Sequence, residues 1–329
     1  MGPIPALAPP AGTRRRDIVL VAGILAFFFA CVTLMAWHET RSSEPAPKLG
    51  EDPPLTTHDR VKALAFLIVV SIPAVYLLGP VGRRVFVRVR EPASPFRFLD
   101  IVLIVSASFL LLVALAGLVH SLLERFRVPE LARIALYQVA QNLWQVAVWV
   151  LLPLVLLALR RSGPRAMGLL PDRWGRILLG AFLAWILFVP IFFLSSFSVE
   201  TIHFLFGKEV EAQEILNRMR DRDEGGYWSF LICATLTACF VAPVVEEFFF
   251  RGVLYSSLRR RLRPLPAMAV SAFLFSLVHW PISTWPSIYI LGLVLAYAYE
   301  RSGSLAAPIA LHALHNIAVM SYMLFLIFA

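Results

Sequence analysis

Long apolar segments separated by short polar connections are the feature that most restricts how this chain of 329 residues can fold. The first covers residues 18–37, close to the roughly 20 residues that an α-helix needs to cross a hydrocarbon core about 30 Å thick. Inside a bilayer no water binds backbone N–H and C=O groups, so such segments form helices with internal hydrogen bonds. The pattern predicts an all-α, polytopic membrane helical bundle.

Apolar segments of helical length recur to the end of the chain. The first could also be a secretory signal peptide, because basic residues precede it, but the segment is long and lacks a clear cleavage site. We therefore expect an extra N-terminal helix in front of about eight core transmembrane helices. The expected helices cover residues 18–37, 63–81, 99–119, 138–159, 177–206, 228–258, 265–280, 286–300 and 305–329.

Composition supports a membrane protein and excludes other classes. Hydrophobic residues make up 59% of the chain and charged residues only 16%, outside the range of soluble globular domains. The net charge of +9 does not indicate a nucleic-acid partner, because the arginines cluster at the ends of apolar segments and form no single basic face. The three cysteines lie in apolar segments without a CxxC pair, so we expect no disulfide framework and no cysteine metal site.

The arginine clusters predict the topology. They occupy every second connection, and the cytoplasmic loops of membrane proteins carry an excess of Lys and Arg. The connection at residues 207–226 is richer in acids and is expected on the opposite side. An Arg-, Ala- and Leu-rich composition is typical of GC-rich bacteria, so we expect a multi-pass protein of the bacterial inner membrane, with a cytoplasmic N-terminus and an external C-terminus. The clusters lie within residues 14–16, 83–97, 160–176 and 259–263.

Three ionisable residues interrupt the apolar segment at residues 228–258. Glu246, Glu247 and Arg251 lie within the sequence VVEEFFFR. An ionisable side chain at membrane depth costs at least about 2.5 kcal/mol, so its presence indicates a functional site. Residues four apart share a helical face, which makes an ion pair between Glu247 and Arg251 the structural explanation for those two. Neighbours on a helix point about 100° apart, so Glu246 is expected to face elsewhere.

Polar residues recur at similar depth in two later segments. Phe275 and His279 lie in the sequence FSLVH, and each is one helical turn from the other. His312 and Asn316 have the same spacing in the sequence HALHN. With a rise of 1.5 Å per residue, Glu246 and His279 lie about 20 and 21 Å from the cytoplasmic end, and His312 and Asn316 about 11 and 17 Å from it. We expect these side chains to meet near mid-membrane.

Together these residues resemble the three motifs of a known family, the CAAX-protease and bacteriocin-processing (CPBP, or Abi) intramembrane proteases. The resemblance covers roughly residues 168–329, including GLLPD at residues 168–172 and RSGSLAAP at residues 301–308. Each motif alone is weak, whereas the three in this order are specific. In chain order the motifs are Glu246-Glu247-x-x-x-Arg251, Phe275-x-x-x-His279 and His312-x-x-x-Asn316.

The resemblance implies hydrolysis of a peptide bond within the membrane by a water molecule that a glutamate activates. Carried over to this sequence, it makes Glu246 the general base and gives His279 the role of holding the water or the substrate. His312 and Asn316 would stabilise the oxyanion of the transition state. The expected site therefore comprises the catalytic residues Glu246, Glu247, His279, His312 and Asn316 and the supporting residues Arg251 and Phe275.

We expect the chain to divide into three parts. Residues 1–17 are expected to be a disordered basic N-terminus and residues 18–98 a transmembrane extension. Residues 99–329 would form the protease core, with the motifs within residues 240–320. His315 lies to one side of the helical face that carries His312, so it is expected to be structural.

A zinc site is the chemical alternative within the enzyme interpretation. Glu246, His279 and His312 could supply three protein ligands with one open position, as in hydrolytic zinc enzymes. The sequence has no HExxH motif, so we expect a reaction that uses no metal and no other cofactor.

The expected partners are the lipid bilayer and a membrane protein or peptide substrate. Prenylated C-terminal peptides, leader peptides and C-terminal membrane sorting tags all remain candidates, although a bacterial origin disfavours prenylated ones, and nothing in the sequence indicates the oligomeric state. A non-catalytic membrane scaffold or chaperone and a proton-coupled transporter are the alternative functions. The complete set of motif residues argues against the scaffold, and the lack of an internal repeat argues against the transporter.

Overall fold

The structure is a computed structural model that describes residues 57–85, 96–123, 125–126, 128–160, 167–169, 173–206, 225–279 and 281–328. The expected N-terminal helix at residues 18–37, the basic N-terminus and most of the connection at residues 207–226 lie outside the described residues. Every regular element in the described ranges is helical. The elements are α2 (Thr57–Val85), α3 (Phe98–Leu123), α4 (Glu130–Gln145), η1 (Val146–Leu151), α5 (Leu152–Leu159), α6 (Trp174–Leu205), α8 (Tyr227–Leu236), η3 (Thr237–Val241), α9 (Ala242–Glu247), η4 (Phe248–Tyr255), α10 (Ser256–Leu258), α11 (Pro264–Leu277), η5 (Ile282–Thr284), α12 (Trp285–Ser302) and α13 (Ala306–Phe328).

Seven helical segments in the described part of the chain are long and apolar enough to cross a membrane. Three of them are composite: α4 continues through η1 into α5, α8 continues through to α10, and η5 leads directly into α12. The predicted polytopic bundle is therefore confirmed. Two helices begin earlier than the sequence suggested, α2 at Thr57 and α4 at Glu130, and each has an acidic residue in its first turn, where the helix dipole favours negative charge.

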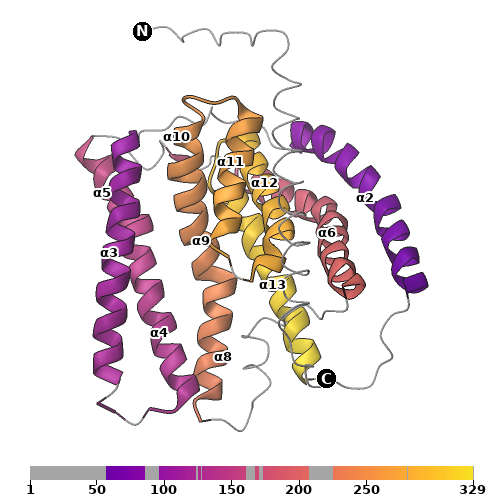
Figure 1. The fold of residues 1–329 in the computed structure, drawn as a ribbon. Helices are drawn as coiled ribbons and strands as arrows, with labels where there is room; N and C mark the ends of the chain where they lie inside the picture. Colours follow the sequence, from indigo (N-terminus) through magenta and orange to yellow (C-terminus); the bar gives the residue numbers. More distant parts are fainter. Residues whose placement is uncertain are drawn as a thin grey trace, which may run out of the picture.

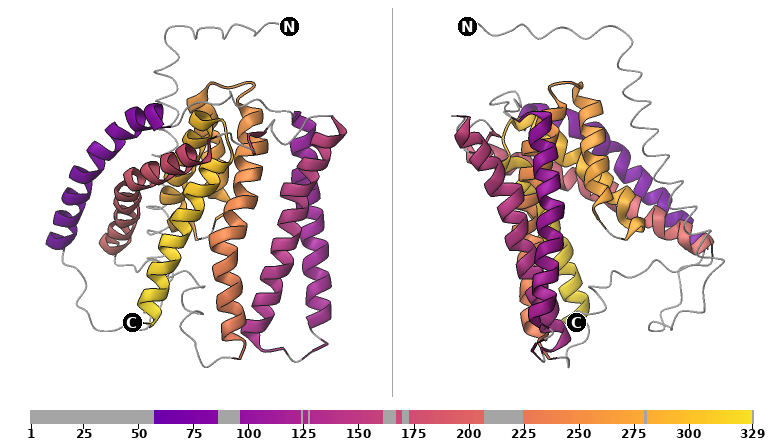
Figure 2. Two further views of the ribbon diagram at one scale, coloured as in Figure 1. Left: turned by 180° about the vertical axis from the view of Figure 1, so that it is seen from behind. Right: turned by 60° about the vertical axis from the view of Figure 1, so that its left-hand side comes forward.

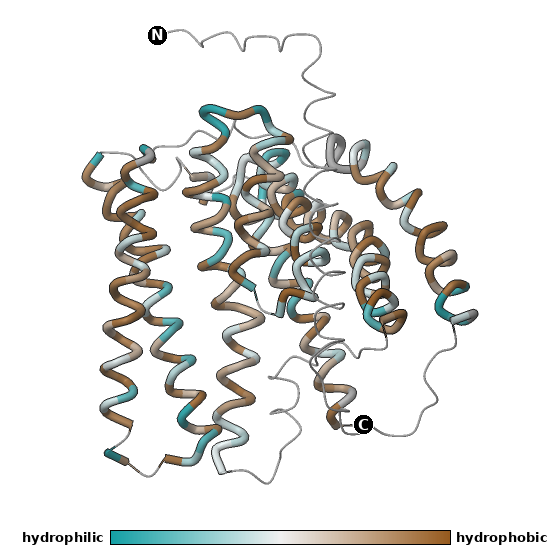
Figure 3. The backbone as a smooth tube through the Cα atoms, in the orientation of Figure 1, coloured by the Kyte–Doolittle hydropathy of each residue, from teal (hydrophilic) through white to brown (hydrophobic). Residues whose placement is uncertain are grey.

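The helices pack as a bundle in which successive long segments run in opposite directions (Figures 1 and 2). On one side of the bundle α3 packs on α4, and α4 packs on α8. On the other side α2 packs on α6, and α12 and α13 also contact α6. In Figure 3 α3 is hydrophobic along most of its length, whereas the turn between α10 and α11 is hydrophilic. Large hydrophobic side chains such as Phe109 and Leu110 of α3 are exposed on the surface of the bundle.

The hairpin of α11 and α12 corrects the expected span at residues 265–280. Helix α11 has only 14 residues, a length of about 21 Å, which is less than the roughly 30 Å of a hydrocarbon core. Figure 1 shows α11 and α12 joined about half way along the bundle, with their other ends near α10. The start of α11 and the end of α12 therefore lie at the same end of the bundle. The expectation of a full span was wrong because an apolar sequence gives no sign of where such a helix turns back, and Trp280 itself lies outside the described residues.

The hairpin turn places irregular backbone inside the bundle, where its polar groups need partners. Trp285 Nε1 donates a hydrogen bond of 2.7 Å to the carbonyl oxygen of His279. Thr284 Oγ1 donates one of 2.7 Å to the carbonyl oxygen of Pro281. The helices approach closely at Gly292, where an added Cβ would lie 3.0 Å from Ala272. Small residues and turn hydrogen bonds together hold His279 at the tip of the hairpin.

A second close contact fixes the start of α13. The carbonyl oxygen of Gly168 accepts hydrogen bonds of 2.7 Å from Ser304 Oγ and 3.1 Å from the backbone N–H of Leu305. Gly168 has a φ of +73°, and a Cβ on it would lie 2.2 Å from the carbonyl oxygen of Gly303, so only glycine fits there. Gly168, the first residue of GLLPD, therefore contacts the RSGSLAAP segment directly before α13.

Candidate active site

The glutamate pair lies on a long helix with two π-helical stretches. The segment from Tyr227 to Leu258 is continuous over 32 residues, and η3 and η4 flank the short α9 that ends with Glu247. A π-helical stretch disturbs the normal i→i−4 ladder and is frequent at functional sites. Side chains of other helices bind carbonyl oxygens here: Ser271 Oγ donates to Phe250 at 3.2 Å. The local geometry of the motif thus depends on the neighbouring helices.

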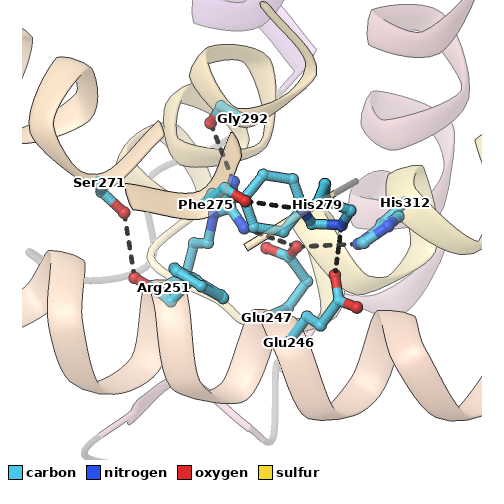
Figure 4. Close-up of polar contacts among 9 residues, drawn as sticks. Glu246, Glu247, Arg251, Ser271, Phe275, His279, Gly292 and His312 are labelled. Atoms are coloured by element: carbon cyan, nitrogen blue, oxygen red, sulfur yellow. Dashed lines mark hydrogen bonds and ion pairs between the residues drawn. The ribbon is translucent and has the colours of Figure 1, made fainter. Parts of the chain in front are cut away.

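Glu247 is the centre of a closed polar cluster (Figure 4). Its Oε1 accepts hydrogen bonds from Arg251 at 2.8 Å and from His312 Nδ1 at 3.0 Å. The side chains of Glu247 and Arg251 are both 0% exposed, and that of His312 is 4% exposed. The predicted i,i+4 ion pair between Glu247 and Arg251 is present. A buried pair of this kind is stable only while both partners stay in place, since removing either leaves an uncompensated charge.

Arg251 ties this cluster to the hairpin. Its second terminal nitrogen donates a hydrogen bond of 3.0 Å to the carbonyl oxygen of Gly292 in α12. Its guanidinium lies 4.5 Å from the ring centroid of Phe275 in α11, within the range of a cation–π contact. Phe275, which is fully buried, also packs edge-on against His312 at 5.8 Å. The expected supporting residues therefore connect the three motifs by direct contact.

Glu246 and His279 form a separate and more accessible pair. His279 Nε2 lies 3.7 Å from Glu246 Oε2, and the two side chains are 27% and 15% exposed. His279 Nδ1 donates a hydrogen bond of 2.7 Å to the carbonyl oxygen of Phe275. Because a carbonyl oxygen only accepts, Nδ1 carries the proton, and in the neutral ring Nε2 presents a lone pair toward Glu246. His279 lies two residues beyond the end of α11, whereas the sequence placed it within the helix.

Asn316 and His315 lie on different faces of α13, as their spacing predicted. Asn316 Nδ2 donates a hydrogen bond of 2.8 Å to the carbonyl oxygen of Ala238 in η3. This side-chain hydrogen bond thus joins Asn316 to backbone about two helical turns before Glu246, and not to a glutamate. His315 packs against the rings of Phe188 and Phe192 in α6, at 5.3 and 4.6 Å. These contacts give His315 the packing role expected of a structural residue.

The donor atoms of the site are arranged as two groups. In the part of the chain that the structure describes, no three His, Cys, Asp or Glu side chains gather closely enough to hold a metal ion. The candidate ligand His312 contacts Glu247, while Glu246 and His279 face each other. Oε2 of Glu246 and Oε2 of Glu247 are buried and accept no hydrogen bond from described residues, so each can accept one more.

Two contributors to the site were not predicted from the sequence. Ser271 binds the carbonyl oxygen of Phe250, and Gly292 supplies a carbonyl oxygen to Arg251. Ser271 is four residues before Phe275, so a polar residue on the Phe275 face was a usable signal. The sequence offers no such signal for Gly292, because every residue has a backbone carbonyl oxygen that can accept a hydrogen bond.

A fully buried ion pair lies beside an accessible glutamate and histidine within a polytopic bundle, and such a pair of side chains is capable of acid–base chemistry at membrane depth. Residues 228–318, somewhat more than a quarter of the chain, match the family model described as type II CAAX prenyl endopeptidase Rce1-like. All seven expected site residues lie within the match, and the resemblance to the CPBP family is thereby confirmed for this segment. No curated protein and no solved structure matches the chain.

Proposed function

We propose that this protein is an intramembrane endopeptidase that cleaves a membrane-associated or lipidated substrate with a water molecule activated by Glu246. The observation that carries the proposal is the unequal exposure of the two glutamates. Glu247 is fully buried and holds Arg251 and His312, whereas Glu246 keeps an exposed fraction of 15% beside His279. Of the two carboxylates, only Glu246 has the access that a substrate requires.

The reaction can be written with this chain's own residues. The lone pair of His279 Nε2 accepts one hydrogen of the water, and the carboxylate of Glu246 accepts the other. The water oxygen bonds to the carbonyl carbon of the substrate as its proton passes to Glu246. The C–N bond then breaks, and the proton moves from Glu246 to the leaving nitrogen, so the glutamate returns to its starting state.

The oxyanion-stabilising roles of His312 and Asn316 stay predictions. One amide hydrogen of Asn316 is bound to Ala238, so only its second hydrogen would be available to an oxyanion. His312 uses Nδ1 for Glu247 and would have to donate from Nε2. Glu247 acts in this proposal by fixing Arg251 and His312, which makes it a positioning residue.

The family description names a prenyl endopeptidase, which supports a lipidated substrate. We extend this to a membrane-anchored peptide cleaved near its C-terminus, with leader peptides as the other candidate. The partners would then be the bilayer and the substrate alone. A peptide pair that differs only in a farnesyl group tests the lipid requirement, since a lipid-dependent enzyme cleaves only the modified peptide.

We place the protein in the bacterial inner membrane with its arginine-rich end in the cytoplasm. The described arginines of the connections after α5 and α10 lie at the same end of the bundle as the open end of the α11–α12 hairpin. In a background without native cysteines, Arg261→Cys should react with a membrane-impermeant thiol reagent only after cell lysis. Gly225→Cys should react in intact cells, and labelling of both on one side would contradict this topology.

The proposed activity is tested by comparing the termini of membrane proteins in cells that carry the wild-type protein or Glu246→Gln. We expect new C- or N-termini of a small set of membrane proteins only with the wild type. Identical termini in both strains, at matched protein abundance, would contradict a protease. Activity on a substrate found in this way should survive exhaustive chelation, because the mechanism assigns water activation to Glu246. Loss of activity on chelation and its return with zinc would favour the metal alternative.

A further inference from the structure

A cleft of about 300 Å³ lies at the arginine-rich end of the bundle, between the start of α3 and the end of α10. Its lining combines apolar Phe96, Ile101 and Leu258 with basic Arg97, Arg260 and Arg261. Twelve residues separate Glu246 from Leu258 along one helix, a distance of about 18 Å. The cleft is therefore distinct from the candidate active site.

The cleft is cationic because the nearby acids already have partners. Asp100, in the first turn of α3, binds the guanidinium of Arg160 and the backbone N–H of Arg97, both at 2.5 Å. The hydrogen bond to Asp100 raises the pKa of Arg160, so that this pair is charged. Glu300 is bound by Tyr255 and by Arg259. Asp100 and Glu300 thus stabilise other groups.

Arg97 and Arg260 are exposed, and their guanidinium groups form no close ion pair with the described residues, although the charge of Arg97 also attracts the carboxylate of Asp100. Arg260 donates one hydrogen bond of 3.3 Å to the carbonyl oxygen of Phe96. A guanidinium has five N–H donors, so most of its capacity is available to another acceptor. Planar guanidinium groups bind phosphate oxygens by paired hydrogen bonds.

The depth of the cleft matches the surface of a bilayer. The apolar stretch of α3 begins at Leu99, and that of the helix that carries Glu246 ends at Leu258. Arg97 and Arg260 lie just beyond these ends, while Ile101 and Leu258 lie just within them. Phosphates of phospholipids occupy the level at which apolar spans end, with acyl chains directly below.

We propose that this cleft binds the phosphodiester headgroup of an anionic phospholipid, with Arg97 and Arg260 on the phosphate and the apolar lining against the first part of an acyl chain. A zwitterionic lipid brings its own cation and would compensate less of the arginine charge. A free phosphate ion would make no use of Phe96, Ile101 or Leu258. The bound lipid would join α3 to the helix that carries the glutamates.

Native mass spectrometry of the full-length protein in a mild detergent tests this proposal with phosphatidylglycerol and phosphatidylcholine of the same acyl chains. Each arginine near an anionic lipid headgroup contributes to the free energy of binding. Removing two of these charges in Arg97→Gln/Arg260→Gln should therefore weaken binding of the first phosphatidylglycerol on the order of 30-fold. Arg97→Lys/Arg260→Lys keeps both charges and should lose much less. Arg173→Gln/Arg176→Gln, which removes the same charge at the start of α6, is the matched control and should bind as the wild type does.

The outcomes separate this site from general charge attraction. Equal weakening by the cleft variant and the control, or unchanged binding by the cleft variant, would overturn the proposal. Displacement of phosphatidylglycerol by millimolar inorganic phosphate would instead show a site for free anions. Equal affinity of the wild type for both lipids would also contradict it. Thermal unfolding of each variant in the same detergent identifies any loss of binding that comes from loss of folding.

Discussion

Helices α3 and α12 both have an apolar, membrane-length sequence, yet they occupy opposite environments. Of the most apolar stretch in each, 6% of the residues are buried in α3 and 56% in the segment that contains α12. Helix α3 therefore meets lipid on most of its surface, whereas α12 is enclosed by α6, α11 and α13. Hydropathy cannot separate these cases, because lipid tails and protein core are equally apolar.

The two helices differ in which partners their polar groups bind. Helix α12 contributes Gly292 to the arginine of the site, and Glu300 to a buried cluster with Tyr255 and Arg259. In α3, Ser108 Oγ donates to the carbonyl of Ile104 and accepts from Trp149 of η1, which joins two outer helices. Substitutions in the inner group of helices should change chemistry and stability, and those on the outer helices should change little. The sequence-based boundary between an extension and a core at residue 99 stays a prediction.

The largest effect is expected from Glu246→Gln. The amide keeps the shape of the side chain and cannot take a proton, so kcat should fall by about 10³-fold while the unfolding midpoint stays near that of the wild type. Glu200→Gln is the matched control, because the Glu200 side chain, near the end of α6, is 51% exposed, although it pairs with the buried Arg60. An assay on an identified substrate in proteoliposomes measures kcat for both variants, and thermal unfolding measures their midpoints. If Glu246→Gln kept most of the activity, Glu246 would not be the general base.

The next effect concerns the buried pair of Glu247 and Arg251. Glu247→Gln and Arg251→Gln should each lower the free energy of unfolding by about 3–5 kcal/mol, since each leaves the other charge unpaired. The double variant should recover part of that loss. Reversible unfolding in mixed micelles measures the cycle. Coupling of Arg251 to Glu246 in place of Glu247 would contradict the division of roles between the two glutamates.

The sequence predicted the fold and the grouping of the motifs because both follow from strong local patterns. Apolar runs located each of the described long helices, and four-residue spacing placed Glu247 opposite Arg251. The depth estimate brought Glu246 and His279 together, which the structure shows at 3.7 Å.

The remainder depended on interactions that no local pattern encodes. The early end of α11 at Leu277 is set by how the hairpin packs on its neighbours, and it moved His279 out of the helix. The π-helical stretches change which carbonyl oxygens need a partner, and so they gave Asn316 its contact with Ala238. Sequence spacing alone had placed Asn316 beside the glutamates.

Asn316→Ala should have an intermediate effect. It leaves the partly buried carbonyl oxygen of Ala238 without its donor, at a cost of about 1 kcal/mol in the free energy of unfolding. Ser271→Ala, which removes the donor to Phe250, is the matched control for a helix carbonyl. A positioning role predicts similar losses of stability in both variants. A fall of kcat in Asn316→Ala alone, with unchanged stability, would show instead that its amide acts on the oxyanion.

The smallest effect is expected on the outer surface of α3. Leu110 is 68% exposed and Leu295 of α12 is 0% exposed, so the same Leu→Ala change compares the two environments directly. Leu295→Ala opens a cavity among packed side chains and should cost about 2–5 kcal/mol. Leu110→Ala exchanges contacts with lipid that exist in the folded and the unfolded protein alike, so it should change stability by less than about 0.5 kcal/mol. Mixed-micelle unfolding of both variants measures the difference. A cost for Leu110→Ala near that of Leu295→Ala would mean that protein covers this face of α3 in the membrane, and a second copy of the chain is then the first partner to test by cross-linking.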